Sequence, residues 1–600
     1  MNIFKDRFSE IKKASEPLYK SPKSVQETIE ILKISESGIF EVADGKYSKT
    51  YRFSDVNYAT RSEDEQESFF QRYCRCLNSF DCTFKITVNN KNKDMDVLRN
   101  EVMLKYRNDG FDKMRESYNR IIEDKILEGR QGIEQERYLT ITIERKNFEE
   151  AKAQFATIEA SMFRSFAELG SKLTPLTGNE RLKILHDYYR LGREDEFNFD
   201  IRQGRITGTD FRNEICNTRI KYHPDYFEDE GKVGRVLFIK KYPTYLSDRF
   251  FTELTFLPVH SVTSVDVVPV PKDLTMKMLQ KKYLGIESDI IKQQRTRNRN
   301  NDFSSDISYA TRQKKKDIEE IMNNVRENDE SLYYVSVTMI VMADNRDELE
   351  SICETVDSIA KGAGCAVDTC MYKQREAVNT TLPIGVRQIE TMRTMLTQSL
   401  AVLMPFNVQE LCDRNGIYYG VNQISKNIIV GNRKKLLNGN GFIFGVSGAG
   451  KSFQAKMEMG SVLLSTDDNV IAVDPMNEYE DVTEKYNGTY INISTNTRNY
   501  INPMDMDVWN LDVLDSKGWV RDKCQFMLSI CEQIMKEITP QQRSIISRCV
   551  KDLYMDIARS REKYVPTMED LYNRLLEQED KEARDVALGL EIFVTGALNI

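Results

Sequence analysis

Gly441-Phe-Ile-Phe-Gly-Val-Ser-Gly-Ala-Gly-Lys-Ser-Phe453 is the stretch that decides the fold of this chain. An apolar run, Phe442 to Phe444, precedes the pattern Gly-x-x-x-x-Gly-Lys-Ser, and apolar residues recur on the turns that follow. A strand, a glycine-rich turn and a helix in this order are typical of a phosphate-binding loop. The alternative interpretation is a glycine-rich turn that only begins a helix.

Each residue type in this loop has a chemical reason. The glycines let the backbone turn tightly, so that several N–H groups and the positive end of the next helix point at one anion. The Lys451 ammonium is predicted to lie against the β- and γ-phosphates of ATP, and the Ser452 hydroxyl to bind Mg²⁺. The predicted nucleotide-binding residues are Gly445, Val446, Ser447, Gly448, Ala449, Gly450, Lys451 and Ser452.

Downstream of the loop, residues 469–473, Asn-Val-Ile-Ala-Val, form a run that is apolar after its first residue and ends at Asp474 and Pro475. Such a run predicts a buried parallel strand, and ligands in open α/β sheets bind at the carboxyl ends of strands. Asp474 is therefore a candidate Mg²⁺ ligand, through water, and Glu478 a candidate catalytic residue that orients the attacking water. The sequence leaves open that Asp474 caps its turn and that Glu478 is a surface or subunit-interface residue. A further strand is expected at 489–493.

After residue 513 the pattern is helical. Four helices are expected, near 517–537, 540–560, 567–577 and 581–595, and Thr539 with Gln542 forms a capping box around Pro540. These helices predict an all-α insertion or appendage. No apolar run ending in Asp or Asp-Glu follows Tyr479, so we expect the P-loop core to be incomplete in this sequence. The chain as given is then expected to bind nucleotide weakly and to hydrolyse it poorly.

The residues before the loop alternate between strand and helix patterns. Residues 38–53 predict a hairpin around Asp44-Gly45, and the alternation that follows predicts an α+β domain whose sheet is covered on one face. Two further β-α-β patterns, over 233–270 and 332–372, favour a ferredoxin-like arrangement. The predicted domains are an N-terminal α+β domain at 1–240, a second α+β unit at 241–380 with a helical excursion at 271–330, the first part of the P-loop core at 381–505, and an all-α subdomain at 506–600.

The helical excursion carries the sharpest local charge. The whole chain of 600 residues has a net charge of −8, but Lys292 to Lys316 contains eight Lys or Arg and two Asp. This stretch is a candidate contact for phosphate groups or for an acidic protein surface. The alternative is the solvated tip of a helical hairpin, because few aromatic residues are interleaved to stack bases.

The composition argues against a membrane-spanning protein, a disulfide-rich protein and a histidine-based metal or catalytic site. With 40% hydrophobic and 30% charged residues the chain has a globular balance. Its most apolar stretch, Leu332 to Ala343, contains Ser336 and Thr338 and is shorter than the roughly 20 apolar residues of a spanning helix. The 11 cysteines have no regular spacing, which favours reduced thiols. The three histidines, none of them in a motif, argue against a histidine metal site or a Ser-His-Asp triad; they are His186, His223 and His260.

Three motifs in this order resemble a known family: FGVSGAGKSF at 444–453, VIAVDPMNEY at 470–479 and YINPMDM at 500–506. They are similar to the cytoplasmic traffic ATPases of type IV secretion systems, and most to those of Gram-positive conjugative elements. Upstream segments agree with the resemblance: GIFEVADGKYSKTYRFSDVNY at 38–58, REAVNTTLPIG at 375–385 and YYGVNQISKN at 418–427.

The resemblance implies a RecA-like motor of the HerA–FtsK superfamily that uses ATP and Mg²⁺. It implies a homo-oligomer, often a hexamer, that lies in the cytoplasm at the inner face of the cell membrane. The N-terminal domain then docks on membrane components of the secretion channel. The family's loop corresponds to Gly445–Ser452, and its acidic turn to Asp474 and Glu478. Met476-Asn477 replaces the usual acidic or small pair with Gly in that turn.

The resemblance leaves three functions to compare. The first is a motor that energises assembly of a type IV secretion channel or substrate transfer through it. The second is a DNA-pumping translocase or coupling ATPase, which would contact DNA or a relaxase–DNA substrate through residues 292–316. Coupling proteins usually have N-terminal membrane helices, and the sequence has no such segment, which favours the first function. The third is a nucleotide-regulated assembly scaffold.

Overall fold

The computed structural model describes residues 22–92, 99–100, 102–128, 133–243, 245–299, 309–327, 329–413, 415–424, 427–493, 499, 501–506, 518–560 and 564–596. The chain divides into two units, Met1–Asn469 and Val470–Ile600.

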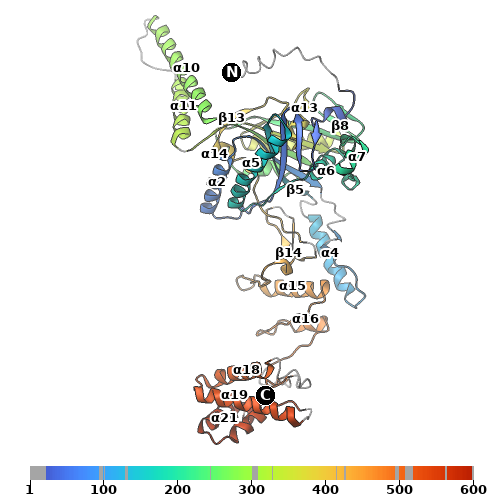
Figure 1. Ribbon diagram of the computed structural model, residues 1–600, viewed down its shortest axis with the longest axis vertical. Helices are drawn as coiled ribbons and strands as arrows, with labels where there is room; N and C mark the ends of the chain where they lie inside the picture. Colours follow the sequence, from blue (N-terminus) through green and yellow to red (C-terminus); the bar gives the residue numbers. More distant parts are fainter. Residues whose placement is uncertain are drawn as a thin grey trace. The chain divides into compact units, whose positions relative to one another are not determined.

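An antiparallel sheet forms the centre of the first unit (Figure 1). Its strands are β1 (Lys33–Ile34), β2 (Ile39–Ala43), β3 (Lys46–Phe53), β4 (Thr83–Asn92), β5 (Ile133–Glu144), β6 (Leu173–Pro175), β7 (Ile220–Tyr222), β8 (Phe227–Asp229), β9 (Lys232–Lys241), β10 (Ser261–Val270), β11 (Leu332–Ala343), β12 (Ala366–Thr369) and β13 (Arg393–Leu396). Among the described residues the strand order is β1-β2-β3-β5-β4-β10-β11-β9-β8-β7, with β6 on β3, β12 on β9 and β13 on β11. The predicted hairpin is confirmed, because β2 pairs with β3 around Asp44-Gly45, where Gly45 has a φ of +67°.

Helices pack on both faces of this sheet. They are α2 (Glu63–Asn78), α5 (Phe148–Leu169), α6 (Gly178–Tyr189), α7 (Ile201–Thr207), α8 (Arg212–Ile215), α9 (Arg249–Thr255), α12 (Arg346–Gly362), α13 (Gln374–Thr381) and α14 (Thr397–Ala401). One core joins the sheet to α2, α5, α9 and α12, and Figure 1 shows α2 beside α5. A second core joins the opposite face to α6, α8 and α13.

The sheet contains the same strand arrangement twice. In the first half, β3-α2-β4-β5-α5-β6 gives the spatial order β6-β3-β5-β4; in the second, β9-α9-β10-β11-α12-β12 gives β12-β9-β11-β10. The halves join where β4 pairs with β10, with Ser261 opposite Asn90. Each half has a helical insertion between its second and third strands: α4 (Asp112–Glu128) in the first, and α10 (Lys272–Arg299) with α11 (Tyr309–Glu327) in the second.

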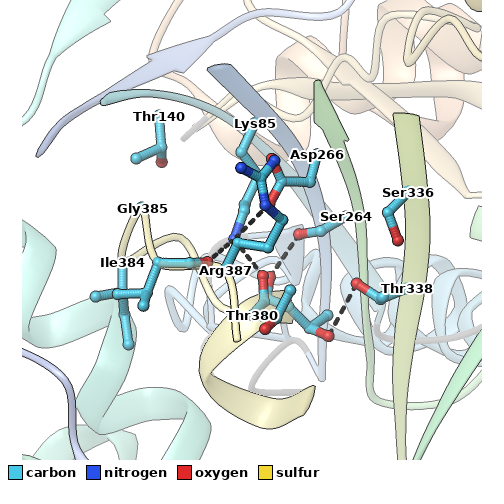
Figure 2. Close-up of polar contacts among 12 residues, drawn as sticks. Lys85, Thr140, Ser264, Asp266, Ser336, Thr338, Thr380, Ile384, Gly385 and Arg387 are labelled. Atoms are coloured by element: carbon cyan, nitrogen blue, oxygen red, sulfur yellow. Dashed lines mark hydrogen bonds and ion pairs between the residues drawn. The ribbon is translucent and has the colours of Figure 1, made fainter. Parts of the chain in front are cut away.

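A segment of residues 380–391, which we call the strap, crosses the polar face of the sheet (Figure 2). Ser48 of β3 donates to the carbonyl of Ile384 (2.6 Å), and Ser264 of β10 donates to the carbonyl of Thr381 (2.5 Å). Buried Lys85 of β4 donates to the carbonyls of Thr380, Leu382 (3.4 Å) and Val386 (3.1 Å), and it lies 3.8 Å from Asp266. Because a buried carbonyl needs a donor, the polar side chains of these strands satisfy the backbone of the strap.

The prediction that the sheet is covered on one face is therefore wrong. Along β4, Phe84 and Ile86 point into one core while Lys85 and Thr87 alternate with them, a pattern that indicates a solvated second face. The polar side chains instead face the strap, and Lys85 and Thr87 are both buried. The polar residues alternate with apolar ones because they form hydrogen bonds to the strap, and not because they face water.

The predicted division at residues 240 and 241 falls within β9, and the sheet continues across it. The domain boundaries stay predictions. The expected excursion is present as α10 and α11, which lie side by side and project from the sheet in Figure 1. Within the described part of the chain, no helix combines the length and the apolarity that crossing a membrane requires.

The remaining elements of the first unit carry the predicted loop. They are β14 (Ile417–Val421), β15 (Ile428–Gly431) and α15 (Lys451–Ser465). β14 and β15 form an antiparallel pair.

The second unit contains α16 (Glu480–Lys485), α18 (Trp519–Met535), α19 (Pro540–Ser560), α20 (Met568–Leu576) and α21 (Lys581–Val594). The last four match the predicted helices, and they share one core. The predicted capping box of Thr539 with Gln542 is confirmed, and Thr567 forms a second one with Asp570. Met504, from YINPMDM, is fully buried in the core of these helices.

Candidate nucleotide-binding site

The predicted phosphate loop leads directly into α15. Gly448 and Gly450 have φ angles of +79° and +90°, a left-handed conformation that favours glycine. Gly450 is the N-cap of α15 and provides no side-chain cap. The first N–H groups of a helix have no partner within it, so here they remain as donors beside the positive end of the helix dipole. This arrangement suits a phosphate group.

Lys451 folds back onto the loop. Its ammonium donates to the carbonyls of Gly445 (2.9 Å) and Val446 (3.1 Å). Space at Gly445 is tight, because a Cβ there would lie 3.2 Å from the Cβ of Ala449 and 3.3 Å from the Cγ of Lys451. The loop is exposed and Ser452 is half-buried at its end. A phosphate group would compete with the two carbonyls for the ammonium.

Side-chain hydrogen bonds connect the middle of α15 with the β14–β15 hairpin. Glu458 accepts hydrogen bonds from Tyr419 of β14 (2.9 Å) and from Arg433 (3.0 Å), and Arg433 donates to the Tyr419 hydroxyl (3.0 Å). These three side chains fix the side of α15 that faces the hairpin. Sequence reasoning did not find them, because a lone Tyr, Arg and Glu carry no spacing signal.

Asp474 organises its own turn in the second unit. Its carboxylate accepts from the backbone N–H groups of Met476 (3.2 Å) and Tyr479 (2.9 Å). Burial raises the pKa of Asp474, but the backbone N–H groups of the turn lower it, and the resulting pKa lies below the usual value. The capping contact, one of the two interpretations that the sequence leaves open, is present. The role of Asp474 in holding Mg²⁺ stays a prediction.

The departure from the family pattern in this turn has a structural counterpart. Asn477 has a φ of +59°, in the left-handed region that Asn tolerates better than most residues. It also accepts a hydrogen bond from the Tyr490 hydroxyl. Glu478 is exposed, and its catalytic role stays a prediction. The loop residues Gly445–Ser452 belong to the first unit, whereas Asp474 and Glu478 belong to the second, so a site shared by both groups is also a prediction.

Three predicted strands around the loop are not strands in the described structure: 442–444, 469–473 and 489–493. Phe444, Ile471 and Ile493 are 88%, 92% and 69% exposed. A strand requires a neighbour that pairs with its N–H and C=O groups, and among the described residues these segments have none. The prediction of paired, buried strands here is therefore wrong.

The basic stretch lies on α10 and α11. Lys315 is bound within the pair, 3.1 Å from Glu287 and 5.1 Å from the ring centre of Tyr283. Other described basic residues of the stretch are exposed: Lys292, Arg295, Arg312, Lys314 and Lys316. Residues 300–308 of the stretch lie outside the described residues. Contact of this stretch with nucleic acid stays a prediction.

Residues 413–587 match the family model described as the TraG P-loop domain. No curated protein matches the chain. The matched segment begins just before β14 and ends in α21, so it includes the phosphate loop, the Asp474 turn and most of the four-helix core.

Proposed function

We propose that the chain is a P-loop ATPase of TraG-type conjugative transfer, because residues 413–587 match the TraG P-loop domain, and that its hydrolysis of ATP energises a type IV secretion channel. The energy drives assembly of the channel or transfer of substrate through it. The observation that carries the proposal is the start of α15, where uncapped backbone N–H groups, two left-handed glycines and the Lys451 ammonium occur together in one loop.

The chemistry of the site follows from these residues. The backbone of Gly445–Gly450 holds the β-phosphate of ATP, and Lys451 leaves the loop carbonyls to neutralise the β- and γ-phosphates. Ser452 and Asp474 hold Mg²⁺, and Glu478 orients the attacking water. Bringing Asp474 and Glu478 to the loop is part of the proposal, as are the RecA-like core and its all-α insertion.

The remainder of the chain supports assembly. We propose that each half of the sheet is a ferredoxin-like unit and that this front portion docks on membrane components of the channel, at the inner face of the cell membrane. Several copies, forming a hexamer, then act together. The repeated strand order of the two halves supports the first part of this proposal.

Replacing Lys451 by Ala in the protein tests the motor function. We expect loss of nucleotide-dependent phosphate release by at least about 100-fold, since one preorganised charge contributes that much to many transition states. We also expect loss of conjugation. Lys456→Ala, on the same helix but outside the loop motif, is the matched control and should retain both activities. If conjugation persists in Lys451→Ala although hydrolysis is abolished, the motor function is wrong and the scaffold function replaces it.

A DNA-pumping or coupling ATPase is the second candidate, and the exposed basic residues of α10 and α11 favour it. Its test is binding of duplex DNA at several salt concentrations, because affinity that depends on phosphate contacts falls steeply with salt. Replacing Arg312, Lys314 and Lys316 together by Gln should abolish such binding if this candidate is correct. If DNA affinity is unchanged in that variant, the basic stretch has another role.

A further inference from the structure

The last turn of α15 is held by two arginines from a distant segment. This α4 segment, residues 102–128, is the insertion between β4 and β5. Arg115 donates from Nε to the carbonyl of Leu464 (3.1 Å). Arg107 donates to the carbonyls of Ser465 (2.7 Å) and Thr466 (3.3 Å). Carbonyls in the last turn of a helix have no partner within it, so the α4 segment supplies the donors that α15 lacks.

Arg115 is itself fixed in place. Its side chain is fully buried, and its two terminal nitrogens donate to Asp109 (both 2.6 Å) and to Asp112 (2.8 Å). These hydrogen bonds from Arg115 hold the pKa of the Asp109 carboxyl well below its usual value. A guanidinium that is bound in this forked way has little freedom, so Nε remains directed at Leu464. Its positive charge also complements the negative end of the α15 dipole.

An apolar contact fixes the rest of the α4 segment to the same region. Tyr118, Ile122 and Ile126 share a small core with Ile428 and Val430 of β15. The Tyr118 hydroxyl also accepts from the backbone N–H of Tyr418 in β14 (3.4 Å). The α4 segment therefore contacts both the hairpin and the helix that carry the phosphate loop.

The contact is at the opposite end of α15 from Lys451. The helix has 15 residues, so the two ends are about 22 Å apart. The backbone of α15 is hydrogen-bonded along its length, so a displacement of one end shifts the other. The residues from Arg115 to Lys451 thus connect the α4 segment with the loop.

We propose that Arg115 is a positioning residue of the nucleotide site, which fixes the C-terminal end of α15 and thereby sets the position of the phosphate loop relative to the α4 segment. Arg107 adds to the same contact from a more exposed position. The proposal rests on the proposed function in one respect, that Gly445–Ser452 binds nucleotide. Neither Arg115 nor Arg107 is proposed to contact ATP.

Hydrogen exchange of the full chain, followed in peptides over residues 454–466, where the N–H groups of α15 are hydrogen-bonded, is the first test and needs no nucleotide. In Arg115→Ala we expect exchange there to become about tenfold faster, because the helix loses a terminal anchor. Arg115→Lys keeps the charge but not the fork and should give an intermediate rate. Arg120→Ala is the control: it lies on the same helix, 75% exposed, and pairs only with Glu116 in the described structure (3.9 Å), so it should leave the rate unchanged.

The second test measures binding of a fluorescent ATP analogue with Mg²⁺. We expect a dissociation constant about tenfold higher in Arg115→Ala and unchanged in Arg120→Ala. In the unsubstituted chain the nucleotide should in turn slow exchange at residues 112–128, because coupling between two sites is reciprocal. If Arg115→Ala does not fold, Arg107→Ala and Arg115→Lys give the same readouts with smaller changes.

The outcomes separate the two proposals. If exchange at 454–466 is the same in Arg115→Ala, Arg107→Ala and Arg120→Ala, Arg115 only stabilises the α4 segment and the inference is overturned. If the exchange effects occur as expected but the unsubstituted chain binds no ATP analogue, the inference about position stands and the proposed function fails.

Discussion

At the scale of single residues, Lys85 has the most unusual environment in the sheet. It is fully buried under the strap, and Figure 2 shows it near Asp266, which also pairs with Arg387 (3.7 Å). Burial, the largest cause, lowers the pKa of Lys85 to about 8; Asp266 opposes this change and Arg387 adds to it. The carbonyls of the strap that accept from Lys85 offset part of the cost of burying its charge.

This pKa predicts a stability that depends on pH. Between about pH 8 and 10.5 the unfolded chain keeps a proton on Lys85 that the folded chain has lost, so the free energy of unfolding rises with pH in this window. Relative to Lys85→Met, which has no titrating group, the native chain should gain about 3 kcal/mol across it. Denaturant unfolding of both proteins at several pH values measures the difference. A difference that stays constant with pH would contradict the lowered pKa.

The geometry of the phosphate loop could be predicted from the sequence. Its glycines, Lys451 and Ser452 are adjacent in sequence, so the local pattern contains the whole geometry. The bond from Arg115 to the Leu464 carbonyl joins residues 349 positions apart. Neither residue belongs to a spacing pattern, and only the fold brings them together. For the same reason the sequence predicted Asp474 without deciding between its roles as turn cap and Mg²⁺ ligand.

At the scale of elements, the helices with strong start signals were predicted closely. α19 begins after Thr539, whose side chain accepts from the backbone N–H of Gln542, as the predicted capping box requires. The failures were the unpaired segments around the loop and the strap. The apolar run at 469–473 satisfies the pattern of a buried strand, but pairing depends on neighbours that a local pattern does not specify. The strap has no periodicity, because its contacts use backbone carbonyls.

The motif YINPMDM is also an element-scale anchor. Met504 is fully buried among the helices of the second unit, and the Tyr554 hydroxyl donates to its carbonyl. Asn502 donates to the carbonyl of Pro566 (2.9 Å), at the start of the turn before α20. This short segment therefore completes the four-helix core, and its packing gives a physical reason for these residues.

Met504→Ala should destabilise the second unit by about 2–5 kcal/mol, because it leaves a cavity in a packed core. Both tryptophans of the chain, Trp509 and Trp519, belong to this unit, so tryptophan fluorescence during denaturant unfolding reports on it alone. Met476→Ala is the control, since Met476 is 77% exposed and should change the stability little. Equal midpoints for the two variants would argue against the anchoring role of Met504.

At the scale of the whole molecule, the strap joins the two halves of the sheet. It accepts hydrogen bonds from β3, β4 and β5 in the first half and from β10 in the second. Gly385 makes the crossing possible: its φ is +94°, and a Cβ there would lie 2.6 Å from the Cβ of Ser48 and 2.7 Å from the hydroxyl of Thr142. The halves are thus expected to unfold together, and separately from the four-helix core.

Gly385→Val should lower the free energy of unfolding of the first unit by about 3 kcal/mol or more, from backbone strain and overpacking combined. Gly231→Val is the matched control, because Gly231 has a φ of +91° but no atom within 4 Å of its Cβ position. It should show the strain alone, about 1–2 kcal/mol. Calorimetry should show a single unfolding transition of the first unit, shifted to lower temperature in Gly385→Val. Tryptophan fluorescence should show that the unfolding of the second unit is unchanged. Separate transitions for the two halves of the sheet would contradict a joining role for the strap.

The strap also has a consequence in time. Its donors come from strands made early and late in the first unit, and it precedes the phosphate loop in the chain. During synthesis, when N-terminal segments fold first, the strap can settle only after β11 has emerged, and the loop follows it. The part of the chain that would bind ATP is therefore synthesised after the strap has covered the sheet. A nascent chain that stalls before residue 380 would leave the buried charge of Lys85 without its acceptors, and such a chain is a natural target for chaperones.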